Sequence, residues 1–309
     1  MLSIIITAYK EGRSIGAVLE SLFNSEYQNT PNMDYEVILA CPDDETENAA
    51  REKLTELNFD FTKFVRVKDP QKGKPTALNM AFEIAKGDIL ILTDGDVVKI
   101  AKNSVNSLIT ALQRDKMIGG VTARPMSADR KINVFGYWGN LLSDAANDKR
   151  LKDMKSNLAQ NKFFVMSGYL MCIYKPNFKL PAEVLADDAY ISYKIKESGK
   201  AIVYEPLAQV YIKYPTNLSD WYKQKSRSLG GYIQLHQMGV LNHENRTRNF
   251  TSELEYFKFP FQYATSLHEL WWSLLLYPVR LFLWIRIFVE RKILRKSFSR
   301  TWVRIESTK

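Results

Sequence analysis

The sequence contains few of the residues that cross-link a fold or bind transition metals. Of its 309 residues, two are cysteine and three are histidine. Cys41 and Cys172 lie in apolar runs, which favours buried, reduced thiols over a redox or metal-binding pair. His236, His243 and His268 lack the spacing of zinc ligands, both to one another and to the cysteines. The sequence therefore argues against a redox pair and against a zinc site.

Two common nucleotide-binding motifs are also missing. The chain has no G-x-G-x-x-G, and the segment GKPT at 73–76 lacks the upstream glycine that a phosphate-binding P-loop needs. The sequence therefore lacks the motifs that would best indicate a P-loop kinase or a nicotinamide-dependent enzyme. No internal repeat and no low-complexity tract is present either, so a repeat architecture is not indicated.

The amino terminus lacks the features of a secretory signal. MLSIIITAYKEG turns polar too early for an apolar signal core, and it is typical of a first β-strand. Hydrophobic residues make up 46% of the chain and charged residues 25%, as in ordinary globular proteins. We therefore expect a folded protein in the cytoplasm.

The first two thirds of the chain alternate short runs rich in isoleucine and valine with longer helical patterns. Strands are predicted at 2–8, 36–41, 64–67, 88–94, around 118–124, 163–174 and 200–206. Helices are predicted at 14–24, with Ser14 as its cap, and at 46–58, 74–86, 101–115, 187–199 and 218–238. The polar segment 126–162 is expected to form helices and loops. Such alternation predicts an α/β fold with a mostly parallel sheet flanked by helices.

The excess positive charge is concentrated at the carboxyl terminus. The formal net charge is +9, and residues 280–309 carry nine basic side chains against two acidic ones. A basic face for nucleic acid is one explanation of such a segment. The aromatic and aliphatic residues beside these charges favour a membrane surface instead. We therefore expect a membrane partner and no nucleic acid.

Residues 270–289 form an apolar segment that is long enough to match a bilayer core. The segment also contains Pro278, Arg280 and Arg286. An arginine near the centre of a spanning helix costs about 2.5–3.5 kcal/mol. We expect helices that lie in or partly enter the membrane surface, with a single span or a soluble core or dimer helix as alternatives.

The strongest local motif is ILILTDGDVV, in which Asp94, Gly95 and Asp96 follow a buried strand. The carboxyl ends of parallel strands are where ligands bind in such folds. Mg²⁺ and Mn²⁺ bind through one or two carboxylates and complete their shells with phosphate oxygens and water. The motif therefore predicts a divalent metal site, and the alternative is a turn that caps the next helix.

Five blocks of the sequence resemble those of the family 2 glycosyltransferases, in the same order. They are SIIITAYKEG, GKPTALNMAFEIAKGDILILTDGDV, SGYLMCIY, ADDAYISYKIKESGKAIVYEP and QKSRSLGGYIQL. The chain most resembles the membrane-associated members related to cellulose, hyaluronan and chitin synthases. The resemblance implies a GT-A fold in residues 1–238, followed by a basic, aromatic, membrane-associated region at 239–309. It also implies that the donor is a UDP- or GDP-sugar.

The resemblance also implies roles for individual residues. Side chains expected to contact the donor are Thr7, Ala8, Tyr9, Glu11, Asp43, Asp44, Lys74, Asp94, Asp96, Gln224 and Arg227. Asp94 and Asp96 would bind Mg²⁺ or Mn²⁺, with Asp96 the more direct ligand. CPDDET replaces the family's usual DDGSxDxT, so the sequence does not decide between Asp43 and Asp44.

On the acceptor side, the resemblance implies that Gly168 and Asp187 contact the acceptor and that Asp188 is the general base. Alternatively, Asp187 and Asp188 have no role in catalysis and only stabilise the amino terminus of a helix. Gln224 and Arg227 match the family's Q-x-x-R-W motif, but Ser228 replaces its tryptophan. This replacement favours transfer of one sugar over synthesis of a polymer.

The function expected from the whole sequence is inverting transfer of a sugar to an acceptor hydroxyl on a lipid-linked molecule or a glycan. The reaction would take place at the cytoplasmic face of the cell membrane. Two other classes remain open at this stage. A sugar nucleotidyltransferase would share the sheet but usually carries a glycine-rich loop after its first strand, where this chain has TAYKEGRS. A non-catalytic scaffold would share the fold while losing the carboxylates.

Overall fold

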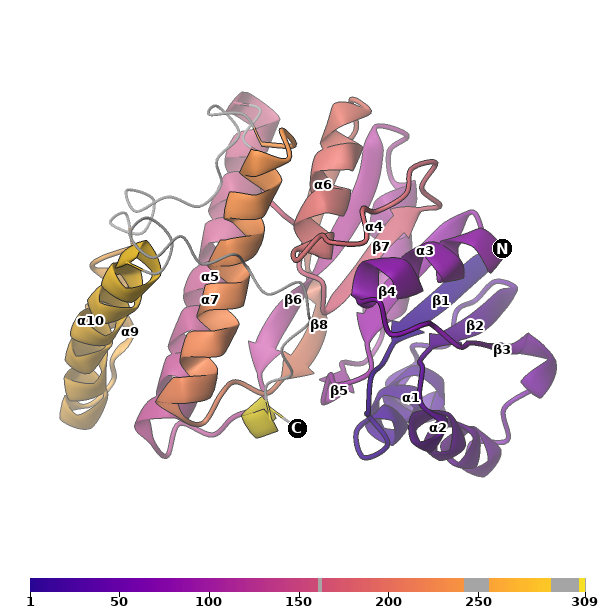
Figure 1. The fold of residues 1–309 in the computed structure, drawn as a ribbon, viewed down its shortest axis with the longest axis horizontal. Coiled ribbons are helices and arrows are strands. Elements are labelled where there is room, and N and C mark those ends of the chain that lie inside the picture. Colours follow the sequence, from indigo (N-terminus) through magenta and orange to yellow (C-terminus); the bar gives the residue numbers. More distant parts are fainter. Residues whose placement is uncertain (161–162, 242–255, 290–305, 309) are drawn as a thin grey trace.

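The computed structural model describes residues 1–160, 163–241, 256–289 and 306–308, and for 156–160, 287–288 and 306 only the backbone (Figure 1). Its strands are β1 Leu2–Thr7, β2 Tyr35–Ala40, β3 Phe64–Val67, β4 Ile89–Asp94, β5 Lys99–Ile100, β6 Ile118–Ser127, β7 Leu170–Tyr174 and β8 Ala201–Ile212. Its α-helices are α1 Ile15–Phe23, α2 Asp44–Glu56, α3 Lys74–Ile84, α4 Ser104–Gln113, α5 Val134–Gln160, α6 Asp187–Glu197, α7 Leu218–Gln237, α9 Phe259–Tyr263 and α10 Leu267–Phe288. Within the described ranges, short 3₁₀ turns lie at Ser25–Tyr27, Phe61–Lys63 and Glu306–Thr308.

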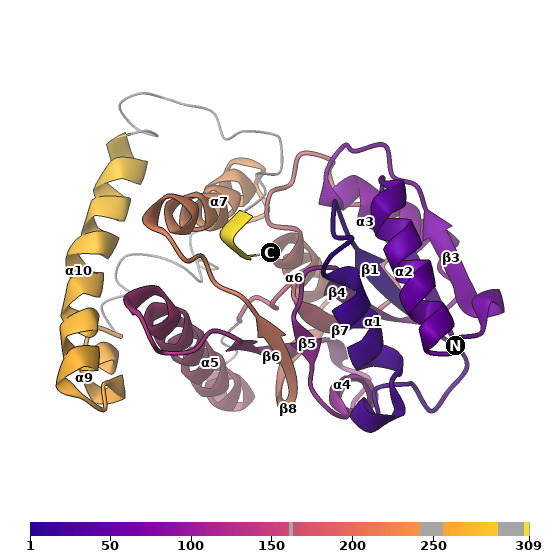
Figure 2. The same ribbon diagram turned by 90° about the horizontal axis from the view of Figure 1, so that it is seen from below.

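Within the described residues, the strands form one sheet in the order β3-β2-β1-β4-β7-β6-β8-β5. Buried side chains of α1, α2 and α4 share a core with one face of this sheet, and those of α3 and α6 share a core with the other. Figure 2 shows α5, α7 and α10 standing beside the β6–β8 end of the sheet. The α/β fold is therefore confirmed.

The sheet is mixed: among the described strands, four pairs are parallel and three are antiparallel, so the predicted excess of parallel pairing is present but small. Strands β3, β2, β1 and β4 run parallel to one another. Strand β7 runs antiparallel to both β4 and β6, whereas β6 and β8 are parallel. A buried strand in either direction has the same apolar pattern, so the sequence does not encode this reversal.

The strand predicted at 163–174 is wrong over its first half, because β7 begins at Leu170. The backbone before it donates its hydrogen bonds to side chains. Met166 N–H bonds Ser192 Oγ at 3.0 Å, and Ser167 N–H bonds Thr122 Oγ1 at 2.8 Å. These bonds replace a strand ladder and turn the segment toward the carboxyl edge of the sheet.

The prediction of helices and loops at 126–162 is partly confirmed, since most of this segment is one long helix, α5, instead of several shorter ones. Its polar residues, which suggested loops, make contacts with the end of β6. Ser143 Oγ and Asn147 Nδ2 both donate to the carbonyl oxygen of Pro125, at 2.8 and 2.7 Å. Both side chains are buried. The polar positions therefore attach α5 to the sheet.

Helix α10 packs one face on α5 and α7. Its Leu276 and Leu283 are buried in an apolar cluster with residues of those helices, including Tyr137 and Trp221. Tyr137 Oη lies 2.7 Å from Ser273 Oγ of α10. Among the described helices, none combines the length and the apolar character that crossing a bilayer requires. Most of the predicted basic tail, 290–305 and Lys309, lies outside the described residues.

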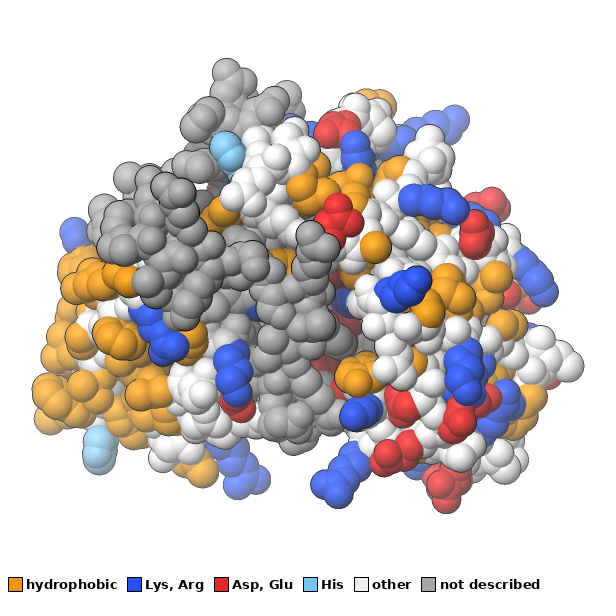
Figure 3. Space-filling model, in the orientation of Figure 1, with side chains coloured by type: hydrophobic (Ala, Val, Ile, Leu, Met, Phe, Trp, Pro, Cys, Tyr) orange, Lys and Arg blue, Asp and Glu red, His pale blue; other side chains and the backbone are white. Residues whose placement is uncertain are grey.

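The opposite face of α10 exposes large apolar side chains, which gather at one edge of the molecule (Figure 3). Trp271 is 58% exposed, Phe282 63% and Ile285 53%. Leu267 at the start of the helix is 86% exposed. Isolated apolar residues on a surface are common, but a contiguous patch marks a surface that contacts a partner or a membrane.

Shortening Leu276 tests how firmly α10 is attached. Leu276→Ala should lower the free energy of unfolding by about 2–5 kcal/mol, because it removes a buried side chain and leaves a cavity. Leu281→Ala on the same helix is the control, since Leu281 is 54% exposed and should change stability by less than about 0.5 kcal/mol. Chemical denaturation followed by circular dichroism measures both. Equal effects would mean that α10 does not contribute to the folded core.

Candidate active site

The triplet Asp94-Gly95-Asp96 follows β4, directly beside the end of β1. Thr7 is the register partner of Asp94, and its Oγ1 donates to Asp94 Oδ1 at 2.9 Å. A Cβ on Gly95 would lie only 2.7 Å from the Cβ of Ala8, so the approach of the two chains requires glycine here. The triplet lies at the edge where the sheet changes from parallel to antiparallel pairing, which is where ligands bind in open α/β sheets.

Lys74 lies at the start of α3, pointing back to this edge. Gly73 precedes it with a φ of 100°, and Pro75 occupies the first turn, so both residues set where the helix begins. Lys74 Nζ lies 2.7 Å from Asp94 Oδ1 and 3.1 Å from Asp187 Oδ2. The lysine therefore joins the end of β4 to the start of α6.

The electrostatics of this buried group differ from those of a surface ion pair. Burial opposes the charge on Lys74, but the carboxylates of Asp187 and Asp94 outweigh it and raise the pKa of Lys74. Burial also raises the pKa of Asp94, against the opposing effect of Lys74, and the nearby charges of Asp96 and Asp187 raise it further. Several carboxyl groups thus lie close together around Lys74.

The neighbouring Asp188 points into a different part of the site. Its Oδ2 accepts from Gly168 N–H at 3.3 Å, and its Oδ1 accepts from Ala189 N–H at 2.8 Å. Both aspartates lie in the first turn of α6, where the helix dipole favours negative charge. Asp187 therefore contacts Lys74, whereas Asp188 contacts the loop before β7.

A cleft of about 240 Å³ brings most of the predicted residues together. It lies between the sheet edge, α5, α6 and α7. The predicted residues that line it are Lys74, Asp94, Gly168, Asp187, Asp188, Gln224 and Arg227. Ser228, which stands at the tryptophan position of the Q-x-x-R-W motif, lines the cleft as well. Residues as far apart in the chain as Lys74 and Arg227 thus face one space.

A second cavity, of about 290 Å³, lies on the other side of Lys74 and holds Thr7, Ala8 and Tyr9. The sequence analysis missed Asp69, which is buried and also lines this cavity. Burial raises the pKa of Asp69, and its Oδ1 accepts from a backbone N–H at 2.8 Å. Asp69 lies just after β3, much as Asp94 lies at the end of β4, and this position was the signal that could have identified it.

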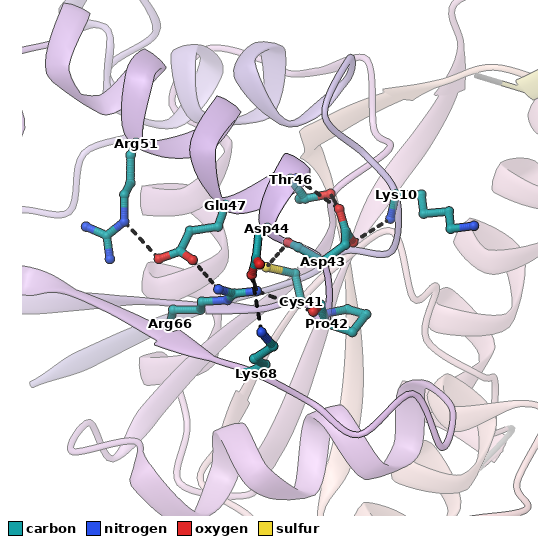
Figure 4. Close-up of polar contacts among 10 residues, drawn as sticks. All are labelled: Lys10, Cys41, Pro42, Asp43, Asp44, Thr46, Glu47, Arg51, Arg66 and Lys68. Atoms are coloured by element: carbon teal, nitrogen blue, oxygen red, sulfur yellow. Dashed lines mark hydrogen bonds and ion pairs between the residues drawn. The ribbon is translucent and has the colours of Figure 1, made fainter.

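Asp43 and Asp44 lie near this cavity but make other contacts (Figure 4). Asp43 caps α2 by accepting from Thr46 N–H at 2.9 Å, and it also accepts from Lys10 N–H at 2.8 Å. Asp44 forms an ion pair with Arg66 at 2.7 Å. Within the described chain, neither aspartate lines the two cavities, so their contact with a donor remains a prediction.

Glu11 is connected to the triplet through the side chain of Ser14. Ser14 Oγ donates to Glu11 Oε2 at 2.6 Å and to the carbonyl oxygen of Gly95 at 2.9 Å. Ser14 occupies the N-cap position of α1, as predicted, but its hydroxyl forms no capping bond to that helix. Glu11 is buried and does not line either cavity in the described residues. Its contact with the donor therefore also stays a prediction.

The donor set of the triplet fits a divalent cation that shares its shell with a phosphate. Asp94 Oδ1 already contacts Thr7 and Lys74, while Asp96 is partly exposed. No cluster of three or more carboxylate, histidine or cysteine side chains that could hold a metal occurs among the described residues. One or two carboxylates suffice for Mg²⁺ or Mn²⁺ when phosphate oxygens supply further ligands. A closed, all-protein metal cage is not indicated.

The two cysteines take no part in this site. Cys41 and Cys172 are both buried and unpaired with one another. Burial raises the pKa of Cys41 to about 11, and burial likewise raises that of Cys172. Thiols in this state are unreactive near neutral pH. The interpretation of both as buried, reduced side chains is confirmed.

Comparison with known proteins relates the chain to bacterial glycosyltransferases. It is 23% identical over 272 residues to poly-β-1,6-N-acetyl-D-glucosamine synthase of Staphylococcus aureus (strain COL), covering 84% of this chain and 58% of that protein. It is 24% identical over 241 residues to the probable glycosyltransferase YdaM of Bacillus subtilis (strain 168), covering 73% and 53%. The chain thus spans about half the length of the curated relatives it matches.

Two solved structures show the same fold. The mannosyltransferase PcManGT from Pyrobaculum calidifontis, in complex with GDP-Man and Mn²⁺, has a TM-score of 0.64 and 19% identity, covering 96% of this chain and 88% of that one. Glucosyl-3-phosphoglycerate synthase from Mycobacterium tuberculosis, in complex with Mn²⁺, UDP and phosphoglyceric acid, has a TM-score of 0.50 and 16% identity, covering 79% and 80%. These similarities support the expected GT-A fold.

The family assignment rests on a match that covers most of the chain. The model described as glycosyltransferase like family 2 matches residues 1–231. This range includes both cavities' motif residues, from Thr7 to Arg227. The protein belongs to the family 2 glycosyltransferases.

Proposed function

We propose that this protein transfers one sugar, with inversion, from a nucleotide-diphospho-sugar to a hydroxyl of a lipid-linked or glycan acceptor at the cytoplasmic face of a membrane. The observation that carries the proposal is the ion-pair bridge from Asp94 through Lys74 to Asp187. It connects the predicted donor side of the site to the predicted acceptor side. We also propose that residues 1–238 form the catalytic region and residues 239–309 a membrane-associated region.

The donor would occupy the two cavities that meet at Lys74. Its nucleoside fits the cavity beside Thr7 and Tyr9, and its sugar fits the cleft that contains Asp188. PcManGT and the mycobacterial synthase, which share the fold, were solved with Mn²⁺ and with GDP-Man or UDP. A UDP- or GDP-sugar is therefore the donor class that we propose for this protein.

Charge stabilisation and proton removal would together promote transfer. Breaking the bond between sugar and phosphate leaves negative charge on the diphosphate, which Lys74 and Arg227 are placed to stabilise. A Mg²⁺ or Mn²⁺ held by Asp94 and Asp96 would supply Lewis-acid stabilisation of the same charge. Asp188 would take the proton of the acceptor hydroxyl as its oxygen attacks the anomeric carbon. Attack opposite the leaving group in a single displacement inverts that carbon.

The location and the acceptor rest on two separate features. The exposed apolar face of α10, with Trp271 and Phe282, supports a membrane surface. The similarity to poly-β-1,6-N-acetyl-D-glucosamine synthase supports a glycan acceptor. Ser228 at the motif's tryptophan position favours transfer of a single sugar.

The test is release of nucleoside diphosphate from a panel of UDP- and GDP-sugars, with and without Mn²⁺. Asp96→Ala should lower the metal-dependent rate by about 10²-fold or more, because several kcal/mol of charge stabilisation are lost. Glu52→Ala, on the exposed side of α2, is the matched carboxylate control and should behave as wild type. A wild-type rate in Asp96→Ala would contradict the metal role. No donor turnover or binding by the wild type would contradict the enzyme in favour of a scaffold.

A further inference from the structure

The cavity beside Thr7 contains a buried carboxyl group that takes no part in the proposed chemistry. Asp69 is 8% exposed and lines this cavity. Its Oδ1 accepts the backbone N–H of Gln71 at 2.8 Å. Within the described part of the chain, its other oxygen, Oδ2, has no hydrogen-bond partner. A buried carboxyl group of this kind is stabilised by a ligand that donates a hydrogen bond to it.

The charges around Asp69 indicate what kind of ligand group it can accept. Burial raises the pKa of Asp69, and the charge of Asp43 raises it further. Lys72 and Lys74 line the same cavity, but Asp69 forms no ion pair with any described residue. A carboxylate in this position repels a phosphate group. The ligand group that lies at Asp69 is therefore a hydrogen-bond donor without negative charge.

The order of the strands indicates which part of a donor reaches Asp69. Asp94 ends β4 and Asp69 follows β3, while β1 and β2 lie between these two strands (Figure 1). Neighbouring strands are about 4.8 Å apart, so three steps across the sheet amount to about 14 Å. An extended nucleoside diphosphate spans a similar length from its terminal phosphate to the far edge of its base. With the diphosphate at Asp94 and Lys74, that edge lies at Asp69.

The edges of the nucleobases differ in what they offer to a carboxylate. Guanine presents two adjacent donors, its ring N1–H and its amino group at C2, and these match the two oxygens of a carboxylate. Uracil presents a single N–H between two carbonyl oxygens, so a carboxylate gains one hydrogen bond and also meets acceptors. Adenine and cytosine present one donor beside an acceptor nitrogen. A carboxylate at the far edge of the base therefore favours guanine and disfavours the other bases.

We propose that Asp69 selects guanine, so that the donor of this protein is a GDP-sugar and not a UDP-sugar. One donor of the guanine edge bonds Oδ2. The other bonds Oδ1, which keeps a second lone pair beside its bond from Gln71. This inference deepens the proposed function, which leaves the base open, and it rests on that function. A carboxylate that binds the ribose hydroxyls instead would not distinguish between the bases.

Binding of nucleoside diphosphates to the full chain tests the base without sugar or acceptor. The probes are GDP, inosine diphosphate (IDP) and UDP, each with Mn²⁺, and calorimetry gives their Kd values. GDP should bind at least about 10-fold more tightly than either other nucleotide, because it alone presents two adjacent donors. IDP has the same ring system as GDP and lacks only the amino group, so it controls for ring size. Equal binding of GDP and IDP, or of GDP and UDP, would overturn the selection of guanine.

A single substitution assigns the selection to Asp69. Asp69→Asn should shift the preference from GDP toward xanthosine diphosphate (XDP), because xanthine has a carbonyl oxygen where guanine has its amino group. The amide nitrogen of the variant can donate to that oxygen and repels the amino group. The ratio of the Kd for XDP to the Kd for GDP should fall by about 100-fold or more, since one contact is lost and another gained. An unchanged ratio would remove Asp69 as the selecting residue.

Asp34→Asn is the matched control for this substitution. Asp34 is exposed and lies before β2, at the amino end of the parallel strands, whereas Asp69 lies beyond their carboxyl ends. The control should keep the nucleotide preference of the wild type. Circular dichroism reports whether Asp69→Asn is folded. If it is not, the order of GDP, IDP and UDP with the wild type decides the inference by itself.

The same measurements distinguish failure of this inference from failure of the proposed function. Tight binding of UDP without preference for GDP would overturn the guanine assignment alone and leave a sugar transferase with another base. Binding of none of the three nucleotides would contradict the proposed function, and the base assignment would fall with it. Turnover of a GDP-sugar at least about 10-fold faster than that of the matching UDP-sugar would support both.

Discussion

Replacing Asp188 with asparagine should lower kcat for sugar transfer by about 10²–10⁴-fold, the usual contribution of a positioned general base. The amide has nearly the same shape as the carboxylate and can still accept the N–H of Gly168 or Ala189. It cannot take the proton of the acceptor hydroxyl. Donor affinity should change little, because the amide keeps the size of the carboxylate in the sugar cleft and the nucleoside cavity beside Thr7 does not include Asp188.

Steady-state kinetics with the best donor of the panel, with thermal unfolding alongside, check this result. Glu183→Gln is the matched control, since Glu183 is an exposed carboxylate shortly before α6. It should retain the wild-type kcat. An unfolding temperature close to that of wild type shows that the loss in Asp188→Asn is chemical. A kcat within a few-fold of wild type in Asp188→Asn would remove Asp188 as the base.

Replacing Lys74 with methionine should lower both stability and activity. The side chains of Lys74 and Asp187 are only 12% and 14% exposed. Removing the charge of Lys74 therefore leaves the carboxylates of Asp94 and Asp187 facing each other in a buried site. Breaking a buried ion pair by removing one partner costs about 3–5 kcal/mol. The free energy of unfolding should fall by that amount, and turnover of the donor should be lost.

A double-mutant cycle separates the charge effect from packing. Adding Asp187→Asn to Lys74→Met should recover part of the lost stability, since one of the two unpaired charges is then neutral. Lys68→Met serves as the surface control. Lys68 is 65% exposed and its contact with Asp44 is 3.4 Å long, so its loss should cost at most about 1 kcal/mol. Equal effects of the two lysine variants would show that the bridge at Lys74 does not stabilise the fold.

The parts of the fold that the sequence predicted correctly are those with a local physical signal. Runs such as ILILTD bury every position but the last, and the strand ends at the residue where its side chain reaches the site. The same reasoning identified Asp94, because it lies at the end of a buried strand, whereas the roles of Lys74 and Asp188 came from the family resemblance. The family resemblance then supplied the grouping of these residues, which spacing alone does not give.

The parts that the sequence could not predict depend on tertiary partners. The strand predicted at 163–169 failed because Thr122 and Ser192, far away in the chain, supply the hydrogen bonds of that backbone. The polar residues of α5 suggested loops because the sequence does not show their hydrogen-bond partner, the carbonyl oxygen of Pro125. Asp69 was overlooked because a single aspartate after a short strand carries no motif.

The antiparallel insertion of β7 has a consequence for how the protein is made. The strands β1 to β4 come from the first 94 residues and pair with one another in parallel. The free edge of β4, however, stays without its partner until residues 170–174 leave the ribosome. At the usual rate of synthesis this takes about 4–15 s. During that interval the nascent chain exposes an apolar strand edge of the kind that mispairs with other chains. We expect chaperone protection to matter most for this stretch of the chain.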